Sequence, residues 1–390
     1  MRSIGRPILA ARLSNIPPFH VMEVVRIAEQ LELQGVDVIH LEVGEPDFPT
    51  APSVVERACN ALQSGRTRYT DARGIIELRR ALSKWYGTRD TIVPEERIQI
   101  TVGASGALLL ATAATTNPED GVLVADPTYP CNPRFVEAVG GVVHWVQTDA
   151  VHHFHPTQKQ LATEATDRDR TLILAHPANP TGQAVPQEQL RRIIKWCEET
   201  KRHLIVDEIY QNLSFTDELR SSLMLSEQHF VVGSFSKYFN MTGWRLGWLV
   251  IPEYALEATQ RLAQHLFICA PSFAQEAALA CFEPQALEAA ESHRMELKNR
   301  RDFMIPRLKK LGFQIIAEPE GAFYIFVDAS ALTSDAQAFC AQLIIKTGVA
   351  ITPGIDFSLS LPNTWIRIAY TQPLPRLKEA LRRIAGFIGD

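Results

Sequence analysis

The sequence lacks the cysteine pattern of a zinc protein or of a disulfide scaffold. Its six cysteines are scattered singly along 390 residues, and no two of them form a Cys-x-x-Cys pair. Paired cysteines build many zinc sites, and disulfide frameworks belong mainly to small secreted chains. We therefore expect no metal site, no disulfides and a reducing, cytoplasmic setting.

Excess positive charge and a long apolar run are also missing. The chain has 39 Lys and Arg residues against 44 Asp and Glu residues, a net charge of −5. No basic field is therefore available to attract nucleic acid or anionic lipid. The mostly apolar stretch Ala107–Ala114 is too short to span a bilayer. The apolar run Pro7–Ala11 is too short for a signal peptide. We expect neither nucleic acid nor a membrane among the partners.

What is present is the pattern of an α/β protein. Hydrophobic residues make up 46% of the chain, an ordinary share for a globular protein, and the length favours two domains. Short apolar runs predict seven strands, at Ile98–Val102, Val122–Ala125, Val142–Val146, Thr171–Ala175, His203–Val206, Phe230–Gly233 and Leu246–Ile251. Helical periodicity predicts helices at Ser53–Ser64, Ile75–Tyr86, Ala104–Thr116 and Gln187–Thr200. This alternation implies a mostly parallel, seven-stranded sheet sandwiched by helices.

The pattern changes from about Pro284 onward. A long charged helix, Ala286–Leu311, precedes predicted strands and further helices. The strands are expected at Phe313–Ile316, Ala322–Val327, Val349–Thr352 and Trp365–Tyr370. This mixture is typical of a smaller α+β domain. We expect a large domain over residues 46–284 and a small domain formed by residues 1–45 and 285–390.

The strongest candidate for chemistry is Lys237, which ends the segment Ser234-Phe-Ser-Lys237 just after a predicted buried strand. A desolvated lysine amine at such a position could form an imine. Arg245, a little further along, could grip a phosphate through its planar guanidinium group. Ser234 could donate a further hydrogen bond. Taken alone, Lys237 would more often be an ordinary solvated loop lysine.

Other polar residues follow other predicted strands. Asp207 ends one strand, and a carboxylate there could keep a pyridinium nitrogen protonated. Tyr210 could lie beside the 3-oxygen of the same ring, and Asn179, between two prolines, could present its amide to that oxygen. Tyr129 could stack on the ring. The alternatives are a helix cap for Asp207 and ordinary turns for Asn179 and Tyr129.

A small-residue turn between a strand and a helix, Thr101-Val-Gly103-Ala104-Ser105-Gly106, is a candidate phosphate site. Backbone N–H groups at a helix N-terminus hold phosphate well. The rival interpretation is the nucleophile elbow of a hydrolase. It is disfavoured because Ala107 follows Gly106 and because no convincing acid and histidine pair comes later.

Taken together and in this order, the motifs resemble the class I/II aminotransferases of the aspartate-aminotransferase superfamily, which are pyridoxal-phosphate-dependent enzymes of fold type I. The resemblance runs from Val43-Gly44-Glu-Pro-Asp47 to Arg367-Ile-Ala-Tyr370. It implies that Lys237 holds the cofactor as a Schiff base. The other roles it implies are the pyridinium partner (Asp207), the 3-oxygen pair (Tyr210 and Asn179), the phosphate cup (Ala104, Ser105, Ser234 and Arg245), the stacking ring (Tyr129), the α-carboxylate site (Gly44, Asn179 and Arg367) and a contact with the partner subunit's phosphate in a homodimer (Tyr69).

The activity implied by this resemblance is transfer of an amino group from an α-amino acid to a 2-oxo acid by a ping-pong mechanism through pyridoxamine phosphate. Two alternatives stay open. A β-eliminating carbon–sulfur lyase would use the same lysine, aspartate and arginine. A non-catalytic ligand sensor could share the fold, although the complete set of catalytic residue types and the lack of an added DNA-binding domain argue against it. The identity of the amino acid is left open, because specificity lies in the shape of the pocket.

Overall fold

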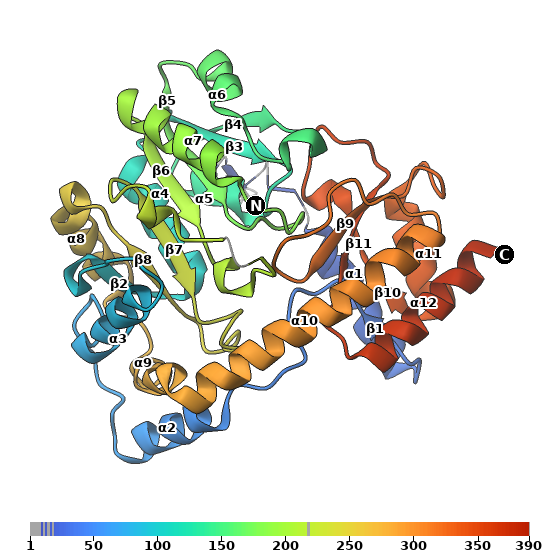
Figure 1. Ribbon diagram of the computed structural model, residues 1–390, viewed down its shortest axis with the longest axis horizontal. Helices are drawn as coiled ribbons and strands as arrows, with labels where there is room; N and C mark the ends of the chain where they lie inside the picture. Colours follow the sequence, from blue (N-terminus) through green and yellow to red (C-terminus); the bar gives the residue numbers. More distant parts are fainter. Residues whose placement is uncertain (1–8, 11, 14–15, 18, 217–218, 390) are drawn as a thin grey trace, which may run out of the picture.

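The fold is described by a computed structural model of residues 9–10, 12–13, 16–17, 19–216 and 219–389 (Figure 1). The apolar run Pro7–Ala11 lies mostly outside these residues. No helix within the described ranges combines the length and the apolar character that crossing a membrane requires.

A seven-stranded sheet forms the centre of the larger part of the molecule. Its strands are β2 (Ile98–Val102), β3 (Gly121–Asp126), β4 (Val142–Gln147), β5 (Asp169–Ala175), β6 (His203–Asp207), β7 (Phe230–Ser234) and β8 (Leu246–Val250). They lie in the order β2-β8-β7-β6-β5-β3-β4. β8 is antiparallel to both of its neighbours, β2 and β7, whereas the other neighbouring pairs of this sheet are parallel. The predicted strands and the prediction of a mostly parallel α/β sheet are confirmed.

Successive residues of a strand pack in different hydrophobic cores, because the sheet is covered on both faces. In β6, Leu204 and Val206 belong to one buried cluster, whereas Ile205 belongs to a second cluster on the other face. The helices of this part are α2 (Pro52–Gln63), α3 (Ile76–Gly87), α4 (Gly103–Thr115), α5 (Cys131–Ala138), α6 (Gln158–Glu164), α7 (Gln187–Glu199), α8 (Leu256–Phe267) and α9 (Ser272–Ala278). Residues of α4 pack in the second cluster and residues of α7 in the first, so these two helices lie on opposite faces.

Among the described residues, the rest of the molecule is built mainly from two small sheets and four α-helices. The strands are β1 (Ile39–His40), β9 (Tyr324–Asp328), β10 (Val349–Ala350), β11 (Thr352–Pro353) and β12 (Trp365–Ala369). They form an antiparallel β11-β12-β9 sheet and a parallel β1-β10 pair. The helices are α1 (His20–Leu33), α10 (Pro284–Lys310), α11 (Ala336–Thr347) and α12 (Leu374–Gly389). The long α10 contacts α2 towards one end of the molecule and α12 towards the other (Figure 1).

Two details of the C-terminal prediction are wrong. Residues Phe313–Ile316 do not form a strand, because only Gln314 exchanges backbone hydrogen bonds with the end of β9, at Asp328. The predicted strand Val349–Thr352 divides into β10 and β11, which pair with different partners. The N-terminal α1 and β1 pack against α11 and β10, far from them in sequence. The domain limits 46–284 and 1–45 with 285–390 stay a prediction.

Candidate active site

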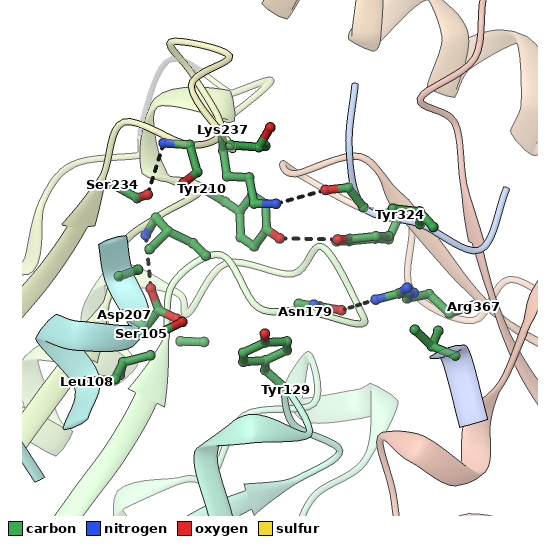
Figure 2. A pocket seen from close by; sticks show the side chains of 18 of the residues that line it. Ser105, Leu108, Tyr129, Asn179, Asp207, Tyr210, Ser234, Lys237, Tyr324 and Arg367 are labelled. Atoms are coloured by element: carbon green, nitrogen blue, oxygen red, sulfur yellow. Dashed lines mark hydrogen bonds between the residues drawn. The ribbon is translucent and has the colours of Figure 1, made fainter. Parts of the chain in front are cut away.

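A cavity of about 260 Å³ lies where the loops after β5, β6 and β7 face α1 and the β11-β12-β9 sheet (Figure 2). Its lining includes every predicted site residue except Tyr69. These are Gly44, Ala104, Ser105, Tyr129, Asn179, Asp207, Tyr210, Ser234, Lys237, Arg245 and Arg367. Tyr69 is absent from the lining and is 82% exposed. The structure thus brings together residues from both ends of the chain.

Lys237 reaches into the cavity from the turn that follows β7. Its Nζ donates a hydrogen bond to the carbonyl oxygen of Gly44 at 2.8 Å (Figure 2). Burial lowers the pKa of Lys237 to about 8, and the nearby guanidinium groups of Arg367 and Arg245 act in the same direction. Near neutral pH a useful fraction of this amine is therefore uncharged, as a nucleophile or a general base requires.

Asp207 is the last residue of β6 and is only 4% exposed. Its Oδ1 accepts one hydrogen bond, from the backbone N–H of Ile209 at 3.1 Å. Burial raises the pKa of Asp207 to about 7. The following residues form only a single 3-10 turn, Gln211–Leu213, so Asp207 does not cap an α-helix. A buried carboxyl group with a raised pKa is suited to a cationic partner.

Arg367 lies in β12 and is 5% exposed. Its Nη1 donates to Oδ1 of Asn179 at 3.0 Å and its Nη2 donates to the carbonyl oxygen of Glu42 at 2.6 Å. Its Nε is buried and has no partner among the described residues. The guanidinium carbon lies 4.3 Å from the ring centroid of Tyr324 and 4.5 Å from that of Phe357. Both oxygen partners are neutral, so the contacts in the described part of the chain give no support to a structural ion pair.

Tyr324 is the main site residue that the sequence interpretation missed. Its hydroxyl lies 3.2 Å from the hydroxyl of Tyr210, and its ring packs on Arg367 (Figure 2). A signal was available. Tyr324 pairs with Ala369 in the β9–β12 ladder, and Ala369 shares a face of the sheet with Arg367 because side chains alternate along a strand. Placing the two predicted strands side by side would have brought Tyr324 to the site.

Gly44 occupies a position that a larger residue could not. A Cβ atom added there would lie 1.7 Å from Oη of Tyr324. The absence of a side chain lets the backbone approach Tyr324 closely, while the Gly44 carbonyl oxygen accepts the hydrogen bond from Lys237.

The N-terminus of α4 and Arg245 form a cradle suited to an anion. The first turn of α4 contains Gly103, Ala104 and Ser105, and the N-cap residue Val102 offers no side-chain cap to its N–H groups. A Cβ atom on Gly103 would lie 2.7 Å from Nη2 of Arg245, so glycine leaves room for the guanidinium group. Free N–H groups, the helix dipole and a guanidinium group together bind phosphate well.

These features fit pyridoxal phosphate. The phosphate cradle, the buried Asp207, the phenol of Tyr210 and the amine of Lys237 all line this cavity and would suit, in turn, the phosphate, ring nitrogen, 3-oxygen and aldehyde of that cofactor. Such a set, below the carboxyl ends of the strands in an α/β sheet, defines a pyridoxal-phosphate-dependent enzyme of fold type I.

Comparisons with known proteins identify the family. Residues 36–384 match the model of the family described as aminotransferase class I and II. The chain is 37% identical to a valine–pyruvate aminotransferase of Mycobacterium tuberculosis, over 96% of this chain and 97% of that relative. It is 35% identical to an aspartate aminotransferase of Thermotoga maritima, over 98% of this chain and 100% of the relative. A crystal structure of an aminotransferase from M. tuberculosis superposes with a TM-score of 0.94 at 36% identity, covering 98% of this chain and 100% of that one.

The chain therefore belongs to the class I and II aminotransferase family. It is a pyridoxal-phosphate-dependent aminotransferase.

Proposed function

We propose that the protein transfers the amino group of an α-amino acid to a 2-oxo acid by a ping-pong mechanism, in which the first oxo acid leaves before the second binds. The observation that best supports this proposal is the state of Arg367. Its charge is buried between two aromatic rings in the same cavity as Lys237, and its hydrogen-bond partners in the described part of the chain are neutral oxygens. A buried cation without a counter-ion favours an anionic ligand, and the α-carboxylate of the donor supplies one.

Four polar residues of the cavity then have definite tasks. When bound, pyridoxal phosphate supplies an electron sink that makes the Cα proton of the donor acidic. Lys237 would take that proton from Cα as a base and deliver it, as an acid, to the carbon of the cofactor's aldehyde group. Its lowered pKa suits it to both roles. Asp207 holds a proton on the ring nitrogen. Arg367 orients the donor, and Asn179 supports the guanidinium group through its 3.0 Å hydrogen bond.

Several lining residues would hold the cofactor in place. Tyr210 and Asn179 bind the 3-oxygen, and Tyr129 stacks on the ring. Ala104, Ser105, Ser234 and Arg245 bind the phosphate. Ser234 is well placed for this because it is only 4% exposed and its Oγ accepts the N–H of Ser236 at 3.0 Å, which fixes the hydroxyl. Tyr324 is added to the predicted set as a residue that positions Tyr210 and Arg367.

The proposal includes a homodimer in the cytoplasm. Tyr69 is 82% exposed and does not line the cavity of its own chain. An exposed tyrosine is available to a neighbouring subunit, where its hydroxyl would donate to the phosphate. The dimer would be symmetric, so each subunit would lend one Tyr69 to the other's site.

Borohydride reduction tests the assignment of Lys237. Protein saturated with pyridoxal phosphate should be yellow, and reduction should fix the cofactor on the proteolytic peptide that contains Lys237. Lys195, an exposed lysine of α7, serves as an internal control and should stay unlabelled. A label on another lysine, or no label in saturated protein, would defeat the assignment. Release of pyruvate and ammonia without an added oxo acid would instead indicate β-elimination.

A further inference from the structure

One wall of the cavity is apolar and comes from α1 and the residue before it. Phe19, Val21, Met22 and Val25 all line the cavity. Val21, Met22 and Val25 follow the spacing that places side chains on one face of a helix. Met22 is 56% exposed, so a large apolar side chain stands open to solvent at the cavity. Covering that surface with an apolar ligand group would be favourable.

The position of this wall is fixed relative to Arg367 by Asp356. The Asp356 carboxylate accepts the backbone N–H of His20 at 3.0 Å and of Val21 at 2.7 Å, and it lies 2.7 Å from Nδ1 of His20. It thereby caps α1, whose own N-cap residue provides no side-chain bond. The next residue, Phe357, packs on the guanidinium group of Arg367. The wall and the α-carboxylate site are thus connected through adjacent residues.

Every charged group that lines the cavity already has a partner or a task. The lining contains five charged residues among those that the structure describes: Glu42, Asp207, Lys237, Arg245 and Arg367. Under the proposed function the last four bind the cofactor or the α-carboxylate. Oε1 of Glu42 lies 2.7 Å from Nδ1 of His40, and this hydrogen bond raises the pKa of His40 to about 9. Glu42 therefore has a protonated histidine as its counter-ion.

No charge within this lining is left for the side chain of a donor. Among the described lining residues of this chain, a second carboxylate on the donor would find no free cation. A donor ammonium group would find no anion there that it could reach, because the second oxygen of Glu42 is buried. Burying an unpaired charge is costly. We propose that the amino donors of this enzyme are α-amino acids with uncharged, apolar side chains, which pack against the α1 face formed by Val21, Met22 and Val25. This inference rests on the proposed function and specifies its substrate class.

A donor panel on the cofactor-saturated enzyme tests the substrate class. The donors are valine, leucine, methionine and phenylalanine, compared with aspartate, glutamate and lysine, each followed by the absorbance change of the single half-reaction. The best apolar donor should exceed every charged donor in kcat/KM by at least about 100-fold. A charged donor that matches or exceeds the apolar ones overturns the inference. If no amino acid reacts at all, the proposed function fails and the inference fails with it.

A binding measurement gives a readout that does not depend on turnover. Calorimetry on the cofactor-saturated enzyme should give a lower Kd for 4-methylpentanoate than for glutarate, because both carry one carboxylate for Arg367 and only glutarate carries a second. Equal affinity, or tighter binding of glutarate, would contradict an apolar wall.

A charge placed on the wall should change the preference. Met22→Arg should raise the ratio of aspartate to leucine activity by at least about tenfold, because it supplies the missing cation. Gln30→Arg is the matched control, since it adds the same charge to an exposed position of α1 that does not line the cavity. The control should keep the wild-type ratio. An equal change in both variants, or no change in Met22→Arg, would mean that this face of α1 does not select the donor.

Discussion

Replacing Asp207 should make the cofactor-free protein more stable while making the enzyme inactive. The Asp207 carboxyl group is 4% exposed, and burial raises its pKa to about 7, against a value of about 4 for an aspartate in an unfolded chain. The folded protein therefore holds a proton that the unfolded chain releases. The stability that comes from this protonated group is fully present below pH 4 and is lost as the pH rises through 7.

The expected size follows from the two pKa values. A difference between about 4 and about 7 corresponds to about 4 kcal/mol, because each pH unit contributes about 1.36 kcal/mol. Asp207→Asn stays neutral at every pH and keeps an oxygen for the N–H of Ile209. At pH 8 the cofactor-free variant should therefore be more stable than cofactor-free wild type by up to about 4 kcal/mol, and the difference should shrink towards zero near pH 4.

Urea unfolding at pH 5, 6, 7 and 8 measures this difference. Asp167→Asn, an exposed position, removes the same charge far from the cavity and should show no comparable trend. A stability difference that does not vary with pH, or wild type gaining on the variant towards pH 8, would refute the reasoning. With pyridoxal phosphate bound, Asp207→Asn should slow the half-reaction by several kcal/mol in barrier, because nothing then holds the ring proton.

Two further experiments test the substrate and subunit assignments. Arg367→Lys should keep the spectrum of the bound cofactor and weaken every α-amino acid donor by roughly 10- to 100-fold, because lysine cannot form the planar two-point contact. Amines without a carboxylate should be unaffected, and a variant that loses stability but keeps donor affinity would show a structural role. Mixing Tyr69→Phe subunits with Lys237→Ala subunits should restore activity, since one site of each mixed dimer would carry neither change. Absence of recovery after confirmed subunit exchange would assign Tyr69 to the site of its own chain.

The parts of the fold that the sequence predicted are those set by local pattern. The strands of the seven-stranded sheet are short apolar runs bounded by polar or small residues, and they form where expected. Lys237 and Asp207 follow strand ends, so the parallel sheet alone brings them to one edge. The segment Phe313–Ile316 has the same apolar texture, yet it makes only one bridge, because pairing depends on a partner that periodicity does not reveal.

The parts that could not be predicted depend on contacts between distant segments. Asp356 caps α1 through the N–H of His20, which lies 336 residues away in the sequence. Nothing in the sequence near either residue indicates this contact. The apolar face of α1 has ordinary helical spacing, so sequence alone does not distinguish it from a face packed on a core. Tyr324 required the register of β9 against β12, and that register depends on how the two strands meet.

The charged groups of the cavity are held apart and are not paired with one another. No ion pair joins Asp207 to Lys237 or Arg367 in the described contacts, and Arg367 is instead bonded to an amide and a backbone carbonyl. A direct carboxylate–guanidinium pair would neutralise both groups and occupy the site with its own atoms. Because the anion and the cations are held apart, Asp207 is available to a ring nitrogen and Arg367 to a carboxylate, so each ligand would bring the opposite charge. Ligand binding and the free energy of unfolding are then linked. The cofactor and the donor should each stabilise the folded protein most strongly under the conditions in which these buried charges destabilise it.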